Sequence, residues 1–180
     1  SWRIACSPVD SQTVYVAVNS GGLYRSKDGG QSFDRVVITS RQTYDLELFP
    51  DASLMISIRG QGVYKSATGD DGSWVLLNNG LPSGSSVGRI ELAYCETQPN
   101  TVYAAVCNSS NTALTGIYRS NDGGASWTQT GGSPVDAGGS FPFTWYCLAL
   151  DVKRDDPEKL IIGSVTLIYS ENGGNNWTRA

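Results

Sequence analysis

The residues best suited to bind a ligand in this sequence are aromatic. They form one dense run, Phe141-Pro142-Phe143-Thr144-Trp145-Tyr146. Aromatic rings at the mouth of a loop can stack on sugar rings, while nearby polar groups fix the orientation of the ligand. The competing interpretation is that Phe141, Phe143 and Trp145 pack beneath the loop, because aromatic side chains are usually well buried. We predict a binding role for Phe143, Trp145 and Tyr146.

A second group of polar residues lies in the first half of the chain. Arg41, Tyr44 and Asp45 are close in sequence, and Arg59 and Gln61 follow. Guanidinium groups form charge-assisted hydrogen bonds, so this group suits a polar or anionic ligand. The same side chains also fit an ordinary solvated surface. We predict a binding role for Arg41, Tyr44 and Arg59.

Composition excludes several kinds of chemistry. The chain has no histidine, so it cannot form a Ser-His-Asp triad or a histidine-ligated metal site by itself. Acid–base catalysis would fall to Asp, Glu, Tyr, Lys or Cys, and we predict no metal or other cofactor. The net charge of −4 argues against a nucleic-acid partner, which needs a basic face. No apolar run approaches the ~20 residues of a membrane-spanning helix.

The four cysteines, Cys6, Cys95, Cys107 and Cys147, form no Cys-x-x-Cys pair. Cys95 and Cys107 are expected on neighbouring strands of one hairpin. Counting outward from a turn near Pro99–Asn100 places Cys95 opposite about Ala104, which is out of register for a disulfide. We therefore predict buried free thiols.

Four copies of one turn motif divide the chain into repeats. They read Gly22-Leu23-Tyr24-Arg25-Ser26-Lys27-Asp28-Gly29-Gly30-Gln31-Ser32-Phe33, Gly62-Val63-Tyr64-Lys65-Ser66-Ala67-Thr68-Gly69-Asp70-Asp71-Gly72-Ser73-Trp74, Gly116-Ile117-Tyr118-Arg119-Ser120-Asn121-Asp122-Gly123-Gly124-Ala125-Ser126-Trp127 and Tyr169-Ser170-Glu171-Asn172-Gly173-Gly174-Asn175-Asn176-Trp177. The aromatic residue lies seven positions after the serine in three copies and eight positions after it in the second copy.

Each position of this motif has a physical role in closing a turn. The Ser and Asp or Asn side chains accept hydrogen bonds from nearby backbone N–H groups. The glycines adopt positive φ at little cost, and the aromatic residue is expected to fill the interface between sheets. We assign this structural role to Ser26, Asp28, Gly30, Phe33, Ser66, Trp74, Ser120, Asp122, Gly124, Trp127, Ser170, Asn172, Gly174 and Trp177.

Strand-like patterns precede every turn in the same order. The alternating or apolar runs predict a strand A at 2–6, 44–49, 89–95 and 145–152, and a strand B at 13–18, 54–58, 101–106 and 160–164. Each unit then reads strand A, strand B, strand C, turn, strand D. The approximate units are 1–39, 40–80, 81–135 and 136–180.

The motif resembles that of the Asp-box, or bacterial neuraminidase repeat, propellers, which include sialidases, xyloglucan-cleaving glycosidases, sortilin-type receptors and photosystem assembly factors. The resemblance implies an all-β fold of four four-stranded antiparallel β-propeller blades, each with an Asp-box turn between strands C and D. In these families the turn lies at the outer edge of the blade, away from the central site. The motif therefore indicates a fold and leaves the activity open.

Four blades are few for such a ring. Three arrangements are open: a segment of a larger propeller, which we favour, a half-ring that pairs with a second copy, and a closed four-bladed ring. Open terminal blades would leave apolar faces exposed unless further blades of the parent chain or a homodimer covered them.

Long loops gather on one face of the predicted propeller, at 78–88, 108–115 and 130–144. Loops on a rigid scaffold carry binding residues more often than other segments, although these loops also suit plain connectors. We predict recognition of a glycan or an extracellular protein through this loop-rich face. The resemblance implies an extracellular, cell-surface or periplasmic location.

The alternative function is that of a fragment of a propeller glycoside hydrolase. The sialidase signature Phe-Arg-Ile-Pro is matched only by Arg-Ile in Trp2-Arg3-Ile4-Ala5, so sialidase activity is disfavoured. Xyloglucan-cleaving members of these families use two aspartates from two facing propellers, and Asp45 or Asp136, expected on the loop-rich face, is the candidate for one of them. Hydrolysis needs two carboxyl groups at a fixed separation, which a sequence cannot demonstrate.

Overall fold

The computed structural model describes residues 3–37 and 39–180. Over these residues the strands form four four-stranded antiparallel sheets, each in simple up-and-down order. The predicted fold class is therefore confirmed. The expected start of the first strand at Trp2 lies outside the described residues. No helix in the described part of the chain is long and apolar enough to cross a membrane.

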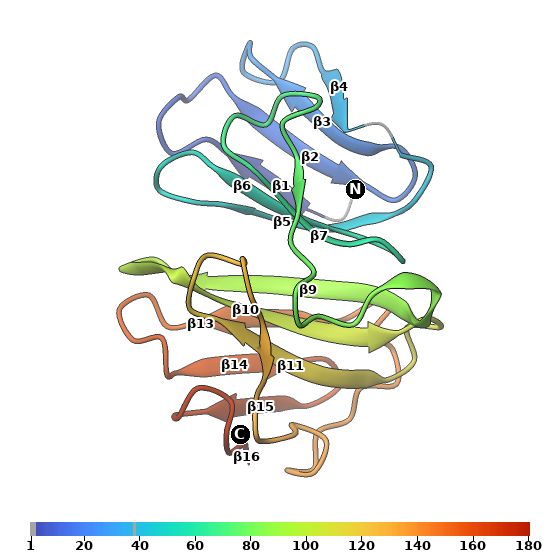
Figure 1. The fold of residues 1–180 in the computed structure, drawn as a ribbon, viewed down its shortest axis with the longest axis vertical. Coiled ribbons are helices and arrows are strands. Elements are labelled where there is room, and N and C mark those ends of the chain that lie inside the picture. Colours follow the sequence, from blue (N-terminus) through green and yellow to red (C-terminus); the bar gives the residue numbers. More distant parts are fainter. Residues whose placement is uncertain (1–2, 38) are drawn as a thin grey trace.

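Each sheet is one blade, and Figure 1 shows the blades in chain order from blue to red. Blade 1 contains β1 (Arg3–Cys6), β2 (Val14–Val18), β3 (Gly22–Ser26) and β4 (Asp34–Val37). Blade 2 contains β5 (Thr43–Leu48), β6 (Leu54–Ile58), β7 (Gly62–Ser66) and β8 (Val75–Leu76). Blade 3 contains β9 (Val87–Cys95), β10 (Gln98–Asn108), β11 (Leu114–Ser120) and β12 (Thr128–Gln129), after the short 3₁₀ turn η1 (Gly84–Ser86). Blade 4 contains β13 (Ala149–Val152), β14 (Leu160–Gly163), β15 (Leu167–Ser170) and β16 (Thr178–Arg179).

The four repeat turns connect the third and fourth strands of each blade. In blade 3, the Ser120 hydroxyl accepts a hydrogen bond of 2.8 Å from the Gly124 N–H, and the Asp122 carboxylate accepts one of 2.9 Å from the Ser126 N–H. Blade 1 repeats this pattern with Ser26 and Asp28. Gly30 and Gly124 have φ values of 93° and 96°, a region in which a side chain would be strained. Local side-chain bonds thus fix the chain reversal at each outer edge.

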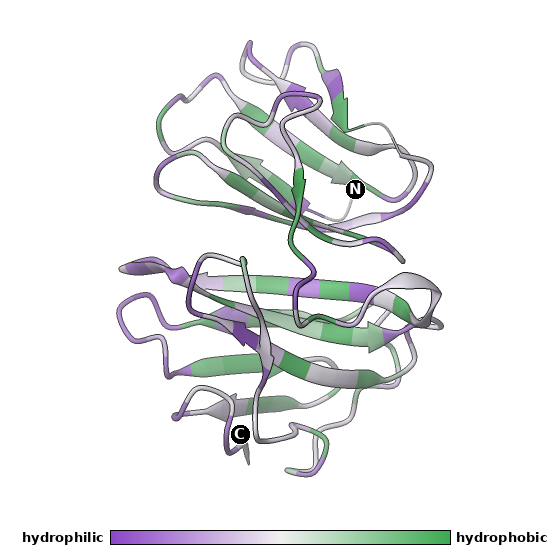
Figure 2. Cartoon of the chain, viewed as in Figure 1, coloured by the Kyte–Doolittle hydropathy of each residue, from purple (hydrophilic) through white to green (hydrophobic). Residues whose placement is uncertain are grey.

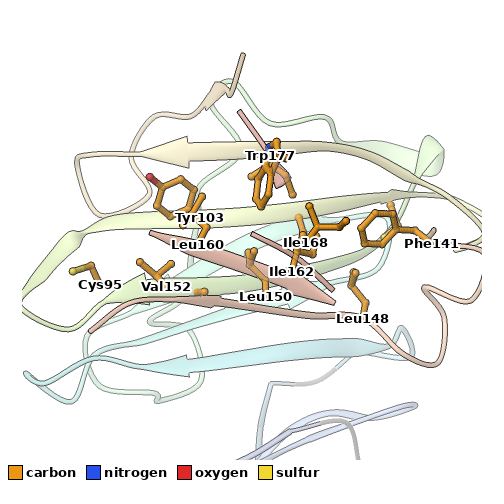
Figure 3. Packing of buried hydrophobic residues seen from close by; sticks show 14 residues of the cluster. Cys95, Tyr103, Phe141, Leu148, Leu150, Val152, Leu160, Ile162, Ile168 and Trp177 are labelled. Atoms are coloured by element: carbon orange, nitrogen blue, oxygen red, sulfur yellow. The ribbon is translucent and has the colours of Figure 1, made fainter. Parts of the chain in front are cut away.

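The core lies between blades, because each of the three clusters of buried apolar side chains is shared by two successive sheets. Figure 2 shows the hydrophobic residues concentrated along the strands of these sheets. We call the face that packs on the next blade in chain order the leading face, and the face that packs on the preceding blade the trailing face. Leu23 on the leading face of blade 1 packs with Leu46 and Ile56 of blade 2. Figure 3 shows the same arrangement at the last interface, where Tyr103 of blade 3 lies against Leu160 of blade 4.

Three such interfaces join the four blades, and no core cluster of the described residues joins blade 4 back to blade 1. The blades therefore form an open arc. A closed four-bladed ring, one of the three arrangements left open by the sequence, is not what the chain forms.

Several expectations need correction. Phe33 is exposed instead of filling a sheet interface, because it lies on the face of blade 1 on which no other blade of the described residues packs. Cys95 pairs with Gln98, and Ala104 pairs with Leu92, because the hairpin turns at Glu96–Thr97. Cys95 and Cys107 are buried free thiols as predicted, whereas Cys6 is exposed and Cys147 is half-buried. The segment 145–148 precedes its strand, which begins at Ala149.

Candidate functional site

The loops that connect successive blades and the turns between second and third strands lie on one face of the arc. A pocket of about 510 Å³ opens on this face between blades 1, 2 and 3. Its lining is mostly polar and comes from five separate segments: Asn19, Ser20, Ser40, Arg41, Gln42, Arg59, Gly60, Ser85, Val87 and Ser109. The fold thus brings together Arg41 and Arg59, which the sequence singled out as binding residues.

Hydrogen bonds orient the Arg59 guanidinium at the wall of this pocket. It donates to the Gln42 amide oxygen and to the Ser109 carbonyl oxygen, both at 2.9 Å. Arg59 lies between β6 and β7, Gln42 precedes β5, and Ser109 lies between β10 and β11, so these bonds connect three loops from two blades. Among the described residues, the exposed Arg41 guanidinium makes one long contact, of 3.5 Å, with the Arg59 carbonyl oxygen. Arg41 is therefore the more adaptable of the two cations.

Tyr44 lies beneath the pocket and does not line it. Its ring is buried, and its hydroxyl donates to the Gln42 amide oxygen at 3.2 Å and accepts a 2.8 Å bond from the Asn111 side-chain amide. The sequence predicted a direct binding role for Tyr44. The structure gives it a supporting position, because the loop after β10 covers its ring.

The aromatic run occupies the loop between blades 3 and 4. Phe141 is buried in the core between these blades (Figure 3), whereas Phe143, Trp145 and Tyr146 are 50%, 50% and 72% exposed. The Trp145 and Tyr146 rings are neighbours, with centroids 5.6 Å apart and planes tilted by 50°. The competing interpretation from sequence is correct for Phe141 and wrong for Phe143 and Trp145. We call Phe143, Trp145 and Tyr146 the aromatic platform.

Backbone contacts hold this platform in place. The Trp145 N–H donates to the Asn111 carbonyl oxygen at 3.0 Å, and the N–H groups of Tyr146 and Cys147 both donate to the Phe143 carbonyl oxygen at 2.9 Å. From below, the buried Arg89 guanidinium donates to the carbonyl oxygens of Thr144 and Leu148 at 3.2 and 2.9 Å. The exposed rings therefore sit on a fixed backbone.

Asn111 and Arg89 are the supporting residues that sequence analysis missed. Asn111 is buried with a φ of 55°, and its side-chain oxygen accepts a hydrogen bond from the Arg89 N–H. Asparagine tolerates this left-handed conformation better than most residues. An asparagine in the middle of a long loop was the available signal, but the other Asn, Ser and Thr residues of the same loop concealed it.

Buried charges line the inner strands of the arc, behind the site. The Asp45 carboxylate accepts hydrogen bonds from the Leu46 and Leu92 N–H groups and lies 3.4 Å from the Arg3 guanidinium. The Arg3 guanidinium also contacts Glu47 at 2.9 Å. Because β1, β5 and β9 each contribute a partner, Asp45 connects three blades. It is buried and does not reach the loop-rich face, which contradicts the expectation that placed it there.

Desolvation raises the pKa of these buried carboxyl groups. Burial is the largest cause for Asp45, and the Arg3 charge opposes it. Burial and the nearby Asp45 carboxylate together raise the pKa of Glu47 to about 8. Burial also raises the pKa of Glu91 well above its ordinary value, although Glu91 pairs with the Arg89 guanidinium at 2.7 Å. Asp136, in contrast, is exposed in the loop between blades 3 and 4.

Comparisons with known proteins indicate the same architecture. No protein-family profile matches the chain. A curated xyloglucanase from Paenibacillus sp is 27% identical over 207 residues, which cover 93% of this chain and 20% of that protein. The chain therefore spans about a fifth of the length of that relative.

Solved structures similar to the chain include an ancestral GH74 enzyme, with a TM-score of 0.76 and 18% identity over 99% of this chain and 24% of that one. The GH74 xyloglucanase from Xanthomonas campestris has a TM-score of 0.72 and 17% identity, over 98% of this chain and 30% of that one. YCF48 from Cyanidioschyzon merolae has a TM-score of 0.60 and 16% identity, over 98% of this chain and 54% of that one. The chain is thus a set of β-propeller blades similar to those of GH74 xyloglucanases and of YCF48.

Proposed function

We propose that this chain supplies glycan-binding blades of a xyloglucanase-like propeller. The observation that carries the proposal is the aromatic platform, whose rings are exposed on a hydrogen-bonded backbone, on the same loop-rich face as the polar pocket. Its support from outside the structure is the similarity to the Paenibacillus xyloglucanase along 93% of the chain.

The chemistry of the face suits a polysaccharide. The flat, apolar faces of sugar rings stack on exposed Trp and Tyr rings, and the hydroxyl groups need nearby donors and acceptors. Trp145 and Tyr146 supply the rings, and the amide of Gln42 with the guanidinium groups of Arg41 and Arg59 supplies the polar contacts in the pocket. Since rigid rings and fixed loops are ordered before the ligand arrives, little conformational entropy is lost on binding.

Hydrolysis would require more than the loops of this face contain. Asp136 is the only carboxylate in the loops 78–88, 108–115 and 130–148. Glycoside hydrolysis uses two carboxyl groups that flank the scissile bond. Asp45 and Glu91 are buried and hydrogen-bonded within the arc, so neither is presented to a ligand on this face. We therefore assign glycan binding to these blades. In a glycosidase that contained them, another part of the enzyme would supply the second catalytic carboxylate.

This proposal also implies a location outside the cytoplasm, because a polysaccharide such as xyloglucan is encountered outside the cell. The similarity to a xyloglucanase supports that location.

The experiment is a calorimetric titration of the chain with xyloglucan heptasaccharide, and with cellotetraose for comparison. We expect saturable binding of the heptasaccharide, weakened about tenfold or more in Trp145→Ala, since truncating an aromatic hot-spot residue to Ala costs about 2 kcal/mol or more. Val9→Ala, an exposed apolar residue in a turn at the opposite face, is the matched control and should bind as the unaltered chain does. Equal affinity of all three proteins would contradict the proposal, as would the absence of binding to either oligosaccharide at millimolar concentration.

A further inference from the structure

The pocket between blades 1, 2 and 3 holds two arginine side chains and no acidic one. Arg41 and Arg59 line it, and none of the described residues along its wall is Asp or Glu. Most other arginines of the chain form ion pairs with carboxylates: Arg3, Arg25, Arg89, Arg119 and Arg154. Arg41 and Arg59 form no ion pair with the described residues, so the pocket carries uncompensated positive charge.

The loops around this pocket differ in charge from the chain as a whole. The chain carries a net charge of −4, yet Asp136 is the only acidic residue in the loops between blades and the turns between second and third strands. Most acidic residues lie in the turns at the opposite face, as do Asp28, Asp70 and Asp122 of the repeat turns. An anion that approaches the loop-rich face therefore meets positive charge at the pocket.

The Gln42 side chain adds a further hydrogen-bond donor to the pocket wall. Its amide oxygen accepts hydrogen bonds from the Arg59 guanidinium at 2.9 Å and from the Tyr44 hydroxyl at 3.2 Å. A guanidinium group can only donate, so the contact with Arg59 identifies the oxygen end of this amide. The amide NH₂ of Gln42 and the N–H groups of Arg59 that do not bond to Gln42 or Ser109 can donate to a ligand.

Gly60 leaves room for the Arg41 guanidinium. It has a φ of 65°, and a Cβ atom added there would lie 2.8 Å from Arg41 Nη1. The Arg41 guanidinium thus lies close to the turn that also contains Arg59. The Arg41 backbone is held by a hydrogen bond of 3.1 Å from its N–H to the Thr39 hydroxyl. Because two like charges in one pocket repel each other, an anion that contacts both guanidinium groups is favoured there.

The size and polarity of the pocket indicate a ligand larger than a bare ion. Its volume of about 510 Å³ lies within the range of roughly 300–1,000 Å³ that is typical of small-molecule sites. Val87 is the only large apolar side chain among the described residues of its wall. The rest of the wall offers hydroxyl and amide groups from Asn19, Ser20, Ser40, Ser85 and Ser109. A charged molecule rich in hydroxyl groups suits this lining better than an apolar acid.

We propose that this pocket binds a carboxylated sugar, a hexuronate residue of a glycan, with its carboxylate between the Arg41 and Arg59 guanidinium groups. A planar carboxylate matches the N–H fork of a guanidinium group and accepts two hydrogen bonds from it. The Gln42 amide and the serine hydroxyl groups bind the hydroxyl groups of the sugar. The assignment rests on the proposed function in one respect, that the ligand is a glycan, and it adds the preference for negative charge.

The test is a nuclear magnetic resonance titration of the backbone amides with D-glucuronate, D-glucose and acetate at millimolar concentrations. We expect glucuronate to shift the Gly60 and Ser109 signals saturably. Glucose, which has a hydroxymethyl group in place of the carboxylate, should bind about tenfold more weakly or less, because it loses the charge-assisted hydrogen bonds. Acetate, which lacks the hydroxyl groups, should also bind more weakly than glucuronate. Added salt should weaken the binding of glucuronate and leave that of glucose unchanged.

Three variants locate the site. Arg41→Gln should bind glucuronate about tenfold more weakly or less, because it loses a cationic donor. Arg41→Lys keeps the charge without the planar fork and should retain an intermediate affinity. Lys27→Gln is the matched control, because it removes the same unit of charge from an exposed turn at the opposite face and should bind as the unaltered chain does. Circular dichroism checks that each variant is folded.

Several results would overturn the proposal: no binding of glucuronate, equal affinity for glucuronate and glucose, or unchanged affinity in Arg41→Gln. Acetate that binds as tightly as glucuronate would overturn the assignment to a sugar. The titration with the neutral xyloglucan heptasaccharide separates this proposal from the proposed function. If glucuronate binds and the heptasaccharide does not, the proposed function fails and the carboxylate pocket stands. If the heptasaccharide binds and glucuronate does not, only the carboxylate pocket fails.

Discussion

The side-chain amide of Asn111 donates a 2.8 Å hydrogen bond to the Tyr44 hydroxyl, 67 positions away in the chain. Both residues are buried. The bond attaches the loop after β10 to the first strand of blade 2, and the Asn111 carbonyl oxygen attaches the same loop to the Trp145 N–H. One asparagine thus sets the position of the Arg59 pocket relative to the aromatic platform.

Replacing Asn111 with Ala should destabilise the protein and loosen the platform. The change removes the side-chain bonds to Tyr44 and Arg89, and two buried hydrogen bonds contribute about 1–3 kcal/mol together. Urea unfolding measures the loss. Asn111→Asp keeps the acceptor for the Arg89 N–H and should lose less, while Ser110→Ala in the same loop should change little. Equal stability of Asn111→Ala and the unaltered chain would show that this bond network has no structural role.

The aromatic residue of the repeat turn should contribute more to the free energy of unfolding where a neighbouring blade buries it. Trp127→Ala should cost about 3–5 kcal/mol, because the ring packs between blades 2 and 3 and its N–H donates to the Leu77 carbonyl oxygen at 3.0 Å. Phe33→Ala at the same repeat position should cost less than about 1 kcal/mol, because this residue is already 43% exposed. Thermal or urea unfolding of both variants makes the comparison. If both variants lost the same free energy of unfolding, Phe33 would be buried in solution, and its face of blade 1 would not be open.

These two examples also show which features the sequence could predict. The motif Ser-x-Asp-x-Gly and the strand patterns are local, so the turns, the sheets and their order were predictable from adjacent residues. The exposure of Phe33 and the burial of Phe141 depend on which blade lies alongside, and local patterns do not encode that.

The site was predictable only in part for the same reason. Arg41, Arg59 and the aromatic platform lie in loops, where residue type alone suggests binding. Tyr44 has the same kind of side chain, but a loop from the next blade covers it. The register of Cys95 was wrong because the hairpin turns before Pro99, and a bulge between Gln98 and Val102 shifts the pairing. Asp45 looked like a surface acid because its partners Arg3 and Leu92 come from other blades.

The buried carboxyl groups should make the protein less stable as the pH rises. The pKa of Glu47 is raised from its ordinary 4.5 to about 8, so between these values the folded state holds a proton that the unfolded state loses. The stabilisation is complete below about pH 4.5 and is lost as the pH rises toward 8. The raised pKa values of Asp45 and Glu91 act in the same direction.

Glu47→Gln tests this assignment, since an amide cannot titrate. We expect the melting temperature of the unaltered chain to fall between pH 5 and pH 8, and that of the variant to fall less steeply. The exposed Glu171, replaced by Gln, serves as control and should leave the slope unchanged. Identical slopes for the unaltered chain and Glu47→Gln would assign the pH dependence to other groups.

Glycan binding at the aromatic platform is tested most directly by nuclear magnetic resonance of the tryptophan side chains. A titration with xyloglucan heptasaccharide reports on each indole N–H separately. We expect a progressive, saturable shift of the Trp145 signal. The signals of Trp127 and Trp177, which are buried and donate to the Leu77 and Gly174 carbonyl oxygens, should stay in place. A Trp145 signal that does not move while the sugar binds elsewhere, or does not bind at all, would contradict it.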